Sequence, residues 1–156
     1  MKTTSKNLIE PMEIAFMEAN KAYENNEVPV GAVITDSYGN VISRAFNLVE
    51  TQQDPTAHAE ILAIKKATVK IGNKRLTDCN LYVTLEPCSM CASAIEQARI
   101  KRLFFGCEDH KKGAVNNGAK IFNQQSCNHK PEIYDGIKEK ECSNLLKKFF
   151  KHLRKK

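Results

Sequence analysis

The chain has 156 residues, 42% of them hydrophobic and 27% charged, and these proportions exclude a disordered or membrane-embedded protein. Its length suits a single domain over residues 1–156 and leaves no room for a second catalytic domain. The net charge of +6 favours an anionic partner such as nucleic acid, although a merely lysine-rich surface gives the same charge.

The N-terminal segment is basic, but Glu10 and Glu13 interrupt it before an apolar stretch of signal-peptide length can form. No later apolar run is long enough to cross a bilayer. We therefore expect a cytoplasmic protein without a membrane partner. In that compartment the six cysteines are expected to be reduced thiols, two of them metal ligands and four packing residues.

The first half of the chain predicts one helix, a hairpin and a second helix. Apolar residues at spacings of three and four predict an amphipathic helix over 7–24. Two β-branched runs, 28–34 and 41–46, flank a Tyr-Gly-Asn turn and predict neighbouring strands. A polar segment follows, in which Asp54-Pro55-Thr56 offers the N-cap and early proline of a helix that Gly72 ends.

The second half alternates strands and helices. We expect a strand over 80–85, a helix over 88–98 and a strand over 100–106. This order predicts strands that are largely parallel, with helices on both faces of the sheet. Residues 107–128 are mostly loop with one short helix near 119–123, and they are expected to line a site or an interface.

The C-terminal part adds a short strand over 131–134 and an amphipathic helix over about 136–153. One face of this helix is apolar and the other is rich in lysine. Such a run of charge is ordinarily just a solvated surface, and contact with phosphates is the alternative. The basic side chains concerned are Lys138, Lys140, Lys147, Lys148, Lys151, Arg154, Lys155 and Lys156.

Two cysteines and a histidine form a candidate zinc site. Cys88 and Cys91 lie one helical turn apart at a predicted helix start, where unpaired N–H groups and the helix dipole favour thiolates. His58, at the start of another predicted helix, can supply a third ligand. Three protein ligands leave a fourth, tetrahedral position for water, as catalytic zinc sites do. By itself a C-x-x-C pair is also common in redox sites and in half of a structural zinc site.

Glu60 lies two residues after His58, and residues at that spacing do not share a helix face. It is therefore poorly placed to bind the same ion and better placed to exchange a proton with the ion's water. An H-x-E motif alone is usually a coincidence. Joined to P-C-x-x-C in this order, it matches the signature of zinc-dependent nucleobase deaminases, in which the Glu is the catalytic acid and base.

From about Met12 to Arg154 the chain resembles the bacterial tRNA-specific adenosine deaminases of the cytidine/deoxycytidylate deaminase superfamily. The resemblance implies an α/β fold of three layers, α/β/α, with a five-stranded mixed sheet. It also implies a homodimer with one Zn²⁺ per subunit that converts the wobble adenosine, position 34 in the tRNA anticodon stem-loop, to inosine. The likeness runs through residues 27–33, 54–61, 81–91, 98–100 and 149–150.

The same resemblance assigns substrate contacts. It implies that Asn47 touches the flipped base, that Ala59 and the Val28-Pro29 segment line the pocket, and that the loop from Asp109 to position 113 contacts flanking nucleotides. Asn47 as an ordinary turn residue is the alternative.

Three positions depart from the family pattern. Leu48 and Val49 replace a frequent Arg-Pro pair, and Glu108 stands where a basic residue precedes the loop aspartate. These departures bear on the details of nucleotide contact.

Two other functions compete with tRNA editing. The same zinc constellation serves deaminases of free bases or nucleosides, such as guanine, cytosine or cytidine. The basic C-terminal helix favours RNA, and Ser89 differs from the proline that we associate with guanine deaminases. A non-catalytic RNA- or protein-binding member of the fold is the third possibility, against which the complete set of His58, Glu60, Cys88 and Cys91 argues.

Overall fold

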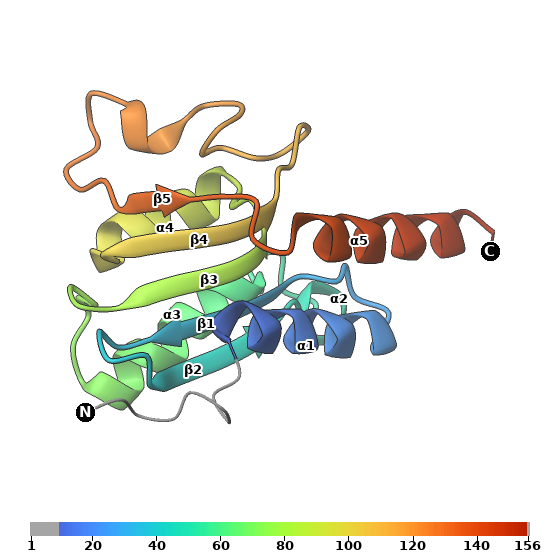
Figure 1. Ribbon diagram of the computed structural model, residues 1–156, viewed down its shortest axis with the longest axis horizontal. Coiled ribbons are helices and arrows are strands. Elements are labelled where there is room, and N and C mark those ends of the chain that lie inside the picture. The colour runs from blue at the N-terminus through green and yellow to red at the C-terminus, as the bar shows by residue number, and fades with distance from the viewer. Residues whose placement is uncertain (1–9, 156) are drawn as a thin grey trace.

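The computed structural model describes residues 10–155, which form a five-stranded mixed sheet between two layers of helices (Figure 1). This is the α/β architecture that the resemblance implied. Along the chain the elements are α1 (Pro11–Glu24), β1 (Gly31–Thr35), β2 (Val41–Phe46), α2 (Val49–Gln52), α3 (Ala59–Ile71), β3 (Asn80–Leu85), α4 (Ser89–Ala98), β4 (Arg102–Cys107), the 3₁₀ turn η2 (Ile121–Asn123), β5 (Glu132–Tyr134) and α5 (Glu139–Arg154).

The strands are ordered β2-β1-β3-β4-β5 across the sheet. β1 runs antiparallel to both of its neighbours, whereas β3, β4 and β5 are mutually parallel. The predicted hairpin and the predicted parallel strands are therefore both confirmed. Because β3 and β4 are parallel, the segments that follow them emerge at the same edge of the sheet, where chemistry-bearing loops of α/β proteins commonly meet.

α1 covers one face of the sheet, and α3 and α4 cover the other (Figure 1). The larger core lies under α3 and α4 and includes Leu81, Ile95, Leu103 and Phe105, all fully buried. α1 lies unusually close to β1. A Cβ atom at Gly31 would come within 2.5 Å of a backbone nitrogen of α1, so only glycine fits there.

Three element boundaries differ from the prediction. α1 begins at Pro11, with the proline in its first turn, and positions 7–9 of the predicted helix lie outside the described residues. The helix expected after Thr56 begins only at Ala59. Asp54 does not cap it, because its Oδ1 accepts hydrogen bonds from the N–H and hydroxyl of Thr56 at 2.8 and 2.7 Å and closes a local turn. The short helix α2 occupies part of the predicted loop.

α5 starts beside the end of β4 and projects beyond the sheet past the end of α1 (Figure 1). Its buried face carries Cys142, Leu145 and Phe149, and Phe149 meets Tyr23 of α1 edge to face at 6.0 Å between ring centroids. Phe150 and Leu153 remain exposed near the projecting end. In the part of the chain from 10 to 155, no helix combines the length and the apolar character needed to cross a membrane.

Candidate active site

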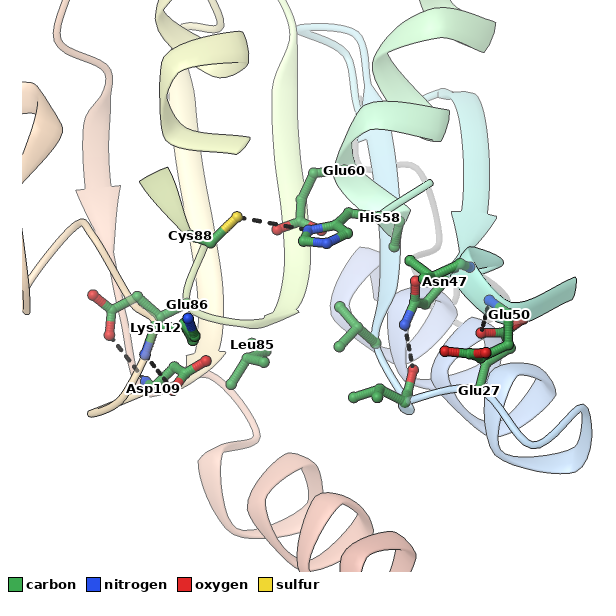
Figure 2. Close-up of a pocket in the computed structure, with 14 residues that line it drawn as sticks. Glu27, Asn47, Glu50, His58, Glu60, Leu85, Glu86, Cys88, Asp109 and Lys112 are labelled. Carbon is green, nitrogen blue, oxygen red and sulfur yellow. Dashed lines mark hydrogen bonds between the residues drawn. The ribbon is translucent and has the colours of Figure 1, made fainter. Parts of the chain in front are cut away.

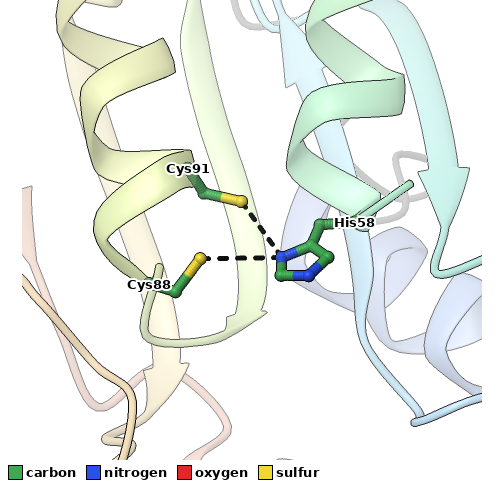
Figure 3. Close-up of side chains that lie close together, drawn as sticks. All are labelled: His58, Cys88 and Cys91. Atoms are coloured by element: carbon green, nitrogen blue, oxygen red, sulfur yellow. Dashed lines mark hydrogen bonds between the residues drawn. The ribbon is translucent and has the colours of Figure 1, made fainter. Parts of the chain in front are cut away.

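The three predicted metal ligands come together between two helix starts. His58 is the residue before α3, Cys88 is the residue before α4, and Cys91 lies in the first turn of α4. Figure 3 shows their side chains pointing at one another across the gap between these helices. One donor atom from each of the three residues lies within 4.8 Å of the other two.

The spacing of these donors suits zinc. The Nδ1 atom of His58 is 3.6 Å from the Cys88 sulfur and 3.4 Å from the Cys91 sulfur. Zn–S bonds of about 2.3 Å and Zn–N bonds of about 2.0 Å at tetrahedral angles place nitrogen and sulfur about 3.5 Å apart. Two sulfurs and one imidazole nitrogen are also a donor set that zinc prefers, and they leave one coordination position open.

The two thiols and the imidazole of His58 shift one another's pKa values. A hydrogen bond with Cys91, together with His58, lowers the pKa of Cys88 to about 4, while the pKa of Cys91 is raised by its bond to Cys88 and by burial. The hydrogen bond with Cys88 also raises the pKa of His58. The lowered pKa favours the thiolate form of Cys88, which is the form in which cysteine binds a divalent cation.

Glu60 is the second residue of α3 and is 4% exposed. Its carboxyl group lies beside His58 and Cys91 at the floor of a pocket (Figure 2). Burial raises the pKa of Glu60 to about 7. This carboxyl can therefore gain and lose a proton near neutral pH, as a general acid and base must.

The pocket above these residues has a volume of about 300 Å³. Four of the five predicted substrate contacts, Val28, Asn47, Ala59 and Asp109, line it. Pro29 does not; it is buried between two residues that do. The volume is at the lower end for small-ligand sites and suits a single base more than a large ligand.

Asn47 is held in the pocket wall by its own side chain. Its Nδ2 donates to the carbonyl oxygen of Val28 at 3.3 Å, and its Oδ1 accepts from the N–H of Val49 at 3.4 Å (Figure 2). Both bonds are long, and each end of the amide retains capacity for a further partner. The structure thus shows the turn role of Asn47, and its amide has free capacity for the predicted base contact.

Asp109 shapes the loop that bears it. Its Oδ1 accepts the N–H groups of Lys111 and Lys112 at 3.1 and 3.0 Å, which closes a tight turn. Lys112, which belongs to the loop predicted to contact flanking nucleotides, also lines the pocket. Of the three positions that depart from the family pattern, Val49 lines the pocket, whereas Glu108 accepts a hydrogen bond from Asn116 at 3.2 Å.

Sequence reasoning also missed two buried glutamates, Glu27 and Glu86, which line opposite sides of the pocket. Glu27 accepts the N–H groups of Glu50 and Thr51 at 3.0 and 2.6 Å and so holds α2 in place. Burial acts to raise the pKa of Glu86, but hydrogen bonds from the loop after β4 outweigh it and lower the pKa. In the sequence, the one signal for either glutamate is its position next to a run of apolar residues.

Comparisons with known proteins agree with this geometry. The family description of the cytidine and deoxycytidylate deaminase zinc-binding region matches residues 5–107. A tRNA-specific adenosine deaminase of Agrobacterium fabrum (strain C58) is 48% identical over 143 residues, which are 92% of this chain and 93% of that protein.

Two solved structures are also similar. One comes from biochemical and structural studies of A-to-I editing by tRNA:A34 deaminases at the wobble position; it has a TM-score of 0.85 and 47% identity, over 86% of this chain and 97% of that one. A guanine deaminase from Bacillus subtilis has a TM-score of 0.61 and 30% identity, over 99% and 96%. The matched zinc-binding region and the extent of these identities show that the chain belongs to the cytidine and deoxycytidylate deaminase family, and within it to the tRNA-specific adenosine deaminases.

Proposed function

We propose that this protein deaminates the adenosine at wobble position 34 of tRNA to inosine by zinc-dependent hydrolysis. The observation that carries the proposal is the His58, Cys88 and Cys91 cluster with Glu60 beside it, opening into a base-sized pocket. This arrangement belongs to a chain that is 48% identical to a tRNA-specific adenosine deaminase over almost its full length.

The proposed centre would hold one Zn²⁺ per chain, with Nδ1 of His58 and the sulfurs of Cys88 and Cys91 as its ligands. When bound, zinc supplies a water activated for attack. In hydrolytic deamination this water adds to C6 of the adenine ring, N1 gains a proton, and the C6–N6 bond breaks. Adenosine and water thereby become inosine and ammonia.

Glu60 is proposed to move the protons. It lies beside the ligand cluster on the pocket floor, where its carboxyl can accept a proton from the attacking water. It delivers that proton to N1, and then carries the second proton of the same water, from the hydroxyl now on C6, to the departing amine. Val28, Ala59 and the amide of Asn47 hold the base above it, and Asp109 sets the loop at the pocket mouth.

Replacing Asn47 by alanine is expected to lower kcat/KM for an adenosine-34 stem-loop by about 10- to 100-fold, because one polar contact to the base is lost. The melting temperature should change little, since the two hydrogen bonds that Asn47 makes to the protein are long. Asn25→Ala, at an exposed turn with a similar side-chain bond, is the control. Equal losses of activity and stability in Asn47→Ala would support a turn role alone.

α5 is proposed to contact the phosphates of the tRNA. It projects from the pocket edge of the sheet, and Lys147, Lys151 and Arg154 are exposed on it. Lys148 lies 5.1 Å from the Tyr23 ring, so part of the positive charge is tied to α1.

The double variant Lys151→Glu/Arg154→Glu is expected to weaken tRNA binding by about tenfold or more at moderate salt and to make the salt dependence shallower. The matched control is Lys74→Glu/Lys101→Glu, which changes two exposed lysines near the starts of β3 and β4, at the other end of the sheet. Filter binding at several salt concentrations measures both effects. Equal weakening in the two variants would indicate net charge and not a phosphate contact.

The chain is further proposed to be one domain, to act in the cytoplasm and to form a homodimer. α3 and α4 leave Ile61, Ile64, Val69 and Met90 partly or fully exposed on the helical layer, and these apolar side chains suit contact with a second copy. Sedimentation equilibrium tests the dimer. A mass that remains at 17.6 kDa at micromolar concentration would reject it.

The function is tested by incubating the zinc-loaded protein with an adenosine-34 anticodon stem-loop and, in parallel, with guanine, cytosine and cytidine. Inosine in the stem-loop and release of ammonia from that substrate alone are expected. A stem-loop with guanosine at position 34 is the matched control. Ammonia from a free base would favour the competing deaminase function, and no ammonia from any substrate would favour a binding protein.

A further inference from the structure

Glu86 is a buried carboxylate with an unusual set of partners. It follows β3 directly, precedes Cys88 by two residues and is 2% exposed. Both oxygens accept hydrogen bonds from a single loop, 109–117. The donors are Asp109 N at 3.0 Å and Asn117 Nδ2 at 2.7 Å to Oε1, and Val115 N at 3.0 Å, Asn116 N at 2.8 Å and Asn117 N at 3.1 Å to Oε2.

No cation neutralises this carboxylate among the described salt bridges, none of which involves Glu86. Its charge is therefore stabilised by five neutral donors. An ionised group without such donors is costly to bury, so opening the loop would leave an unsatisfied charge. The five hydrogen bonds accordingly hold the loop in one arrangement.

The loop also lies directly against the start of α4. Gly113 pairs with Cys88 in an isolated antiparallel bridge, and the N–H of Ala114 donates to the carbonyl oxygen of Pro87 at 2.9 Å. A Cβ atom at Gly113 would lie 2.5 Å from Cδ of Glu86. The carboxylate, the glycine and the metal-binding segment therefore pack with no space between them.

The same loop supplies Asp109 and Lys112 to the pocket wall (Figure 2). Asp109 is bonded to Glu86 through its backbone N–H and to the N–H of Lys112 through its side chain. A chain of hydrogen bonds thus runs from Glu86 through Asp109 to Lys112. Through it, the position of Lys112 at the pocket depends on the buried carboxylate of Glu86.

We propose that Glu86 is a positioning residue for substrate binding, which fixes the 109–117 loop so that Asp109 and Lys112 form one wall of the pocket. This inference rests on the proposed function, because the wall is assigned to the RNA around the edited base. Glu86 lies beside the pocket, but both of its oxygens are bonded to donors of the loop. It acts through the loop.

Glu86→Gln in the zinc-loaded, full-length protein tests the proposal. The amide nitrogen of glutamine would face N–H donors where a carboxylate oxygen accepts them, so at least two bonds are lost. KM for the adenosine-34 stem-loop is expected to rise about tenfold, with kcat within about threefold and zinc content unchanged. Hydrogen exchange should accelerate at the amides of residues 109 and 115–117 and not in the sheet. Glu24→Gln, at an exposed helix position, is the control.

A second substitution should reverse part of the defect. In Glu86→Gln/Asn117→Asp the glutamine amide can donate to the new carboxylate, which restores the side-chain bond with donor and acceptor exchanged. KM should recover by about threefold or more. If Glu86 only supported folding, Glu86→Gln would lower the stability of the protein but would not raise KM while leaving kcat nearly unchanged. If Glu86→Gln does not fold, Asn117→Ala removes the 2.7 Å bond to Glu86, together with the 3.4 Å bond between Asn117 Oδ1 and His110 Nδ1, and should raise KM about threefold.

Four results would overturn the proposal: unchanged exchange in the loop, a fall in kcat alone, loss of zinc, or no recovery in the double variant. Inactivity of the wild-type protein on every stem-loop would reject the proposed function instead. Hydrogen exchange in the wild type and in Glu86→Gln distinguishes failure of this proposal from failure of the proposed function. It needs no substrate and shows directly whether Glu86 holds the loop.

Discussion

Glu60→Gln is expected to lower kcat for adenosine deamination by about 10²- to 10⁴-fold, while zinc content and fold remain those of the wild type. The physical reason is that an amide of the same shape cannot accept a proton from the attacking water or return one to the ring. Glu60 points into the pocket from the second position of α3 and is not one of the three clustered ligands. Single-turnover kinetics with the adenosine-34 stem-loop, together with metal analysis, measure the two properties separately.

The matched control for this prediction is Glu50→Gln, which changes another carboxylate that lines the same pocket but is exposed. Its kcat should stay within about threefold of the wild type, since Glu50 is exposed to solvent, whereas Glu60 is buried beside His58 and Cys91. Loss of zinc from Glu60→Gln would contradict the role assigned to Glu60 and would make it a ligand or a support of one. Equal losses of kcat in Glu60→Gln and Glu50→Gln would show that catalysis depends on the total negative charge of the pocket and not on the position of the Glu60 carboxyl.

The parts of the site that sequence could predict are those that short spacings determine. Cys88 and Cys91 are three residues apart, and any helix that starts there brings their sulfurs to one side. His58 and Glu60 diverge for the equally local reason that positions two apart do not share a helix face. Family resemblance added Asn47, Ala59 and Asp109, whose roles no local spacing determines.

The parts that sequence could not predict depend on contacts between distant segments. Glu86 bonds to residues 23 to 31 positions later, and Glu27 to residues 23 and 24 positions later. A glutamate next to an apolar run has no local feature that separates a buried anchor from a solvated end. The start of α3 was mispredicted for a related reason, since Asp54 uses its oxygen on Thr56 and leaves the helix to begin at Ala59.

The fold was easier to anticipate than its details because its order of elements leaves few arrangements. A hairpin followed by two helix–strand units gives parallel strands with α3 and α4 on one face, and the amphipathic α1 covers the other face. β1 is the one strand that runs against the others, as the partner of β2 in the predicted hairpin. The consequence for function is direct, since β3 and β4 end at one edge and deliver Glu86, Cys88 and Asp109 to the same pocket.

Cys91→Ser is expected to remove most of the bound zinc and, with it, essentially all deaminase activity. A serine hydroxyl is a much poorer zinc ligand than a thiolate, and His58 and Cys88 alone leave two positions of the tetrahedron without protein donors. Cys91 is fully buried, so no solvent-exposed side chain can take its place. Zinc per chain by elemental analysis and inosine formation in the adenosine-34 stem-loop should fall together, and the melting temperature should fall as well, because metal binding contributes to folding.

Cys107→Ser separates the ligand role from the general effect of changing a buried thiol. Cys107 is 4% exposed, lies at the end of β4 and bonds through its sulfur to the carbonyl oxygen of Thr84, a bond that serine can also make. This variant should keep its zinc and most of its activity. Full zinc in Cys91→Ser, or equal zinc loss in both variants, would contradict the proposed ligand set. Because Glu60→Gln is expected to lose activity with its metal in place, whereas Cys91→Ser loses both, the two substitutions together distinguish the group that moves protons from the groups that hold the ion.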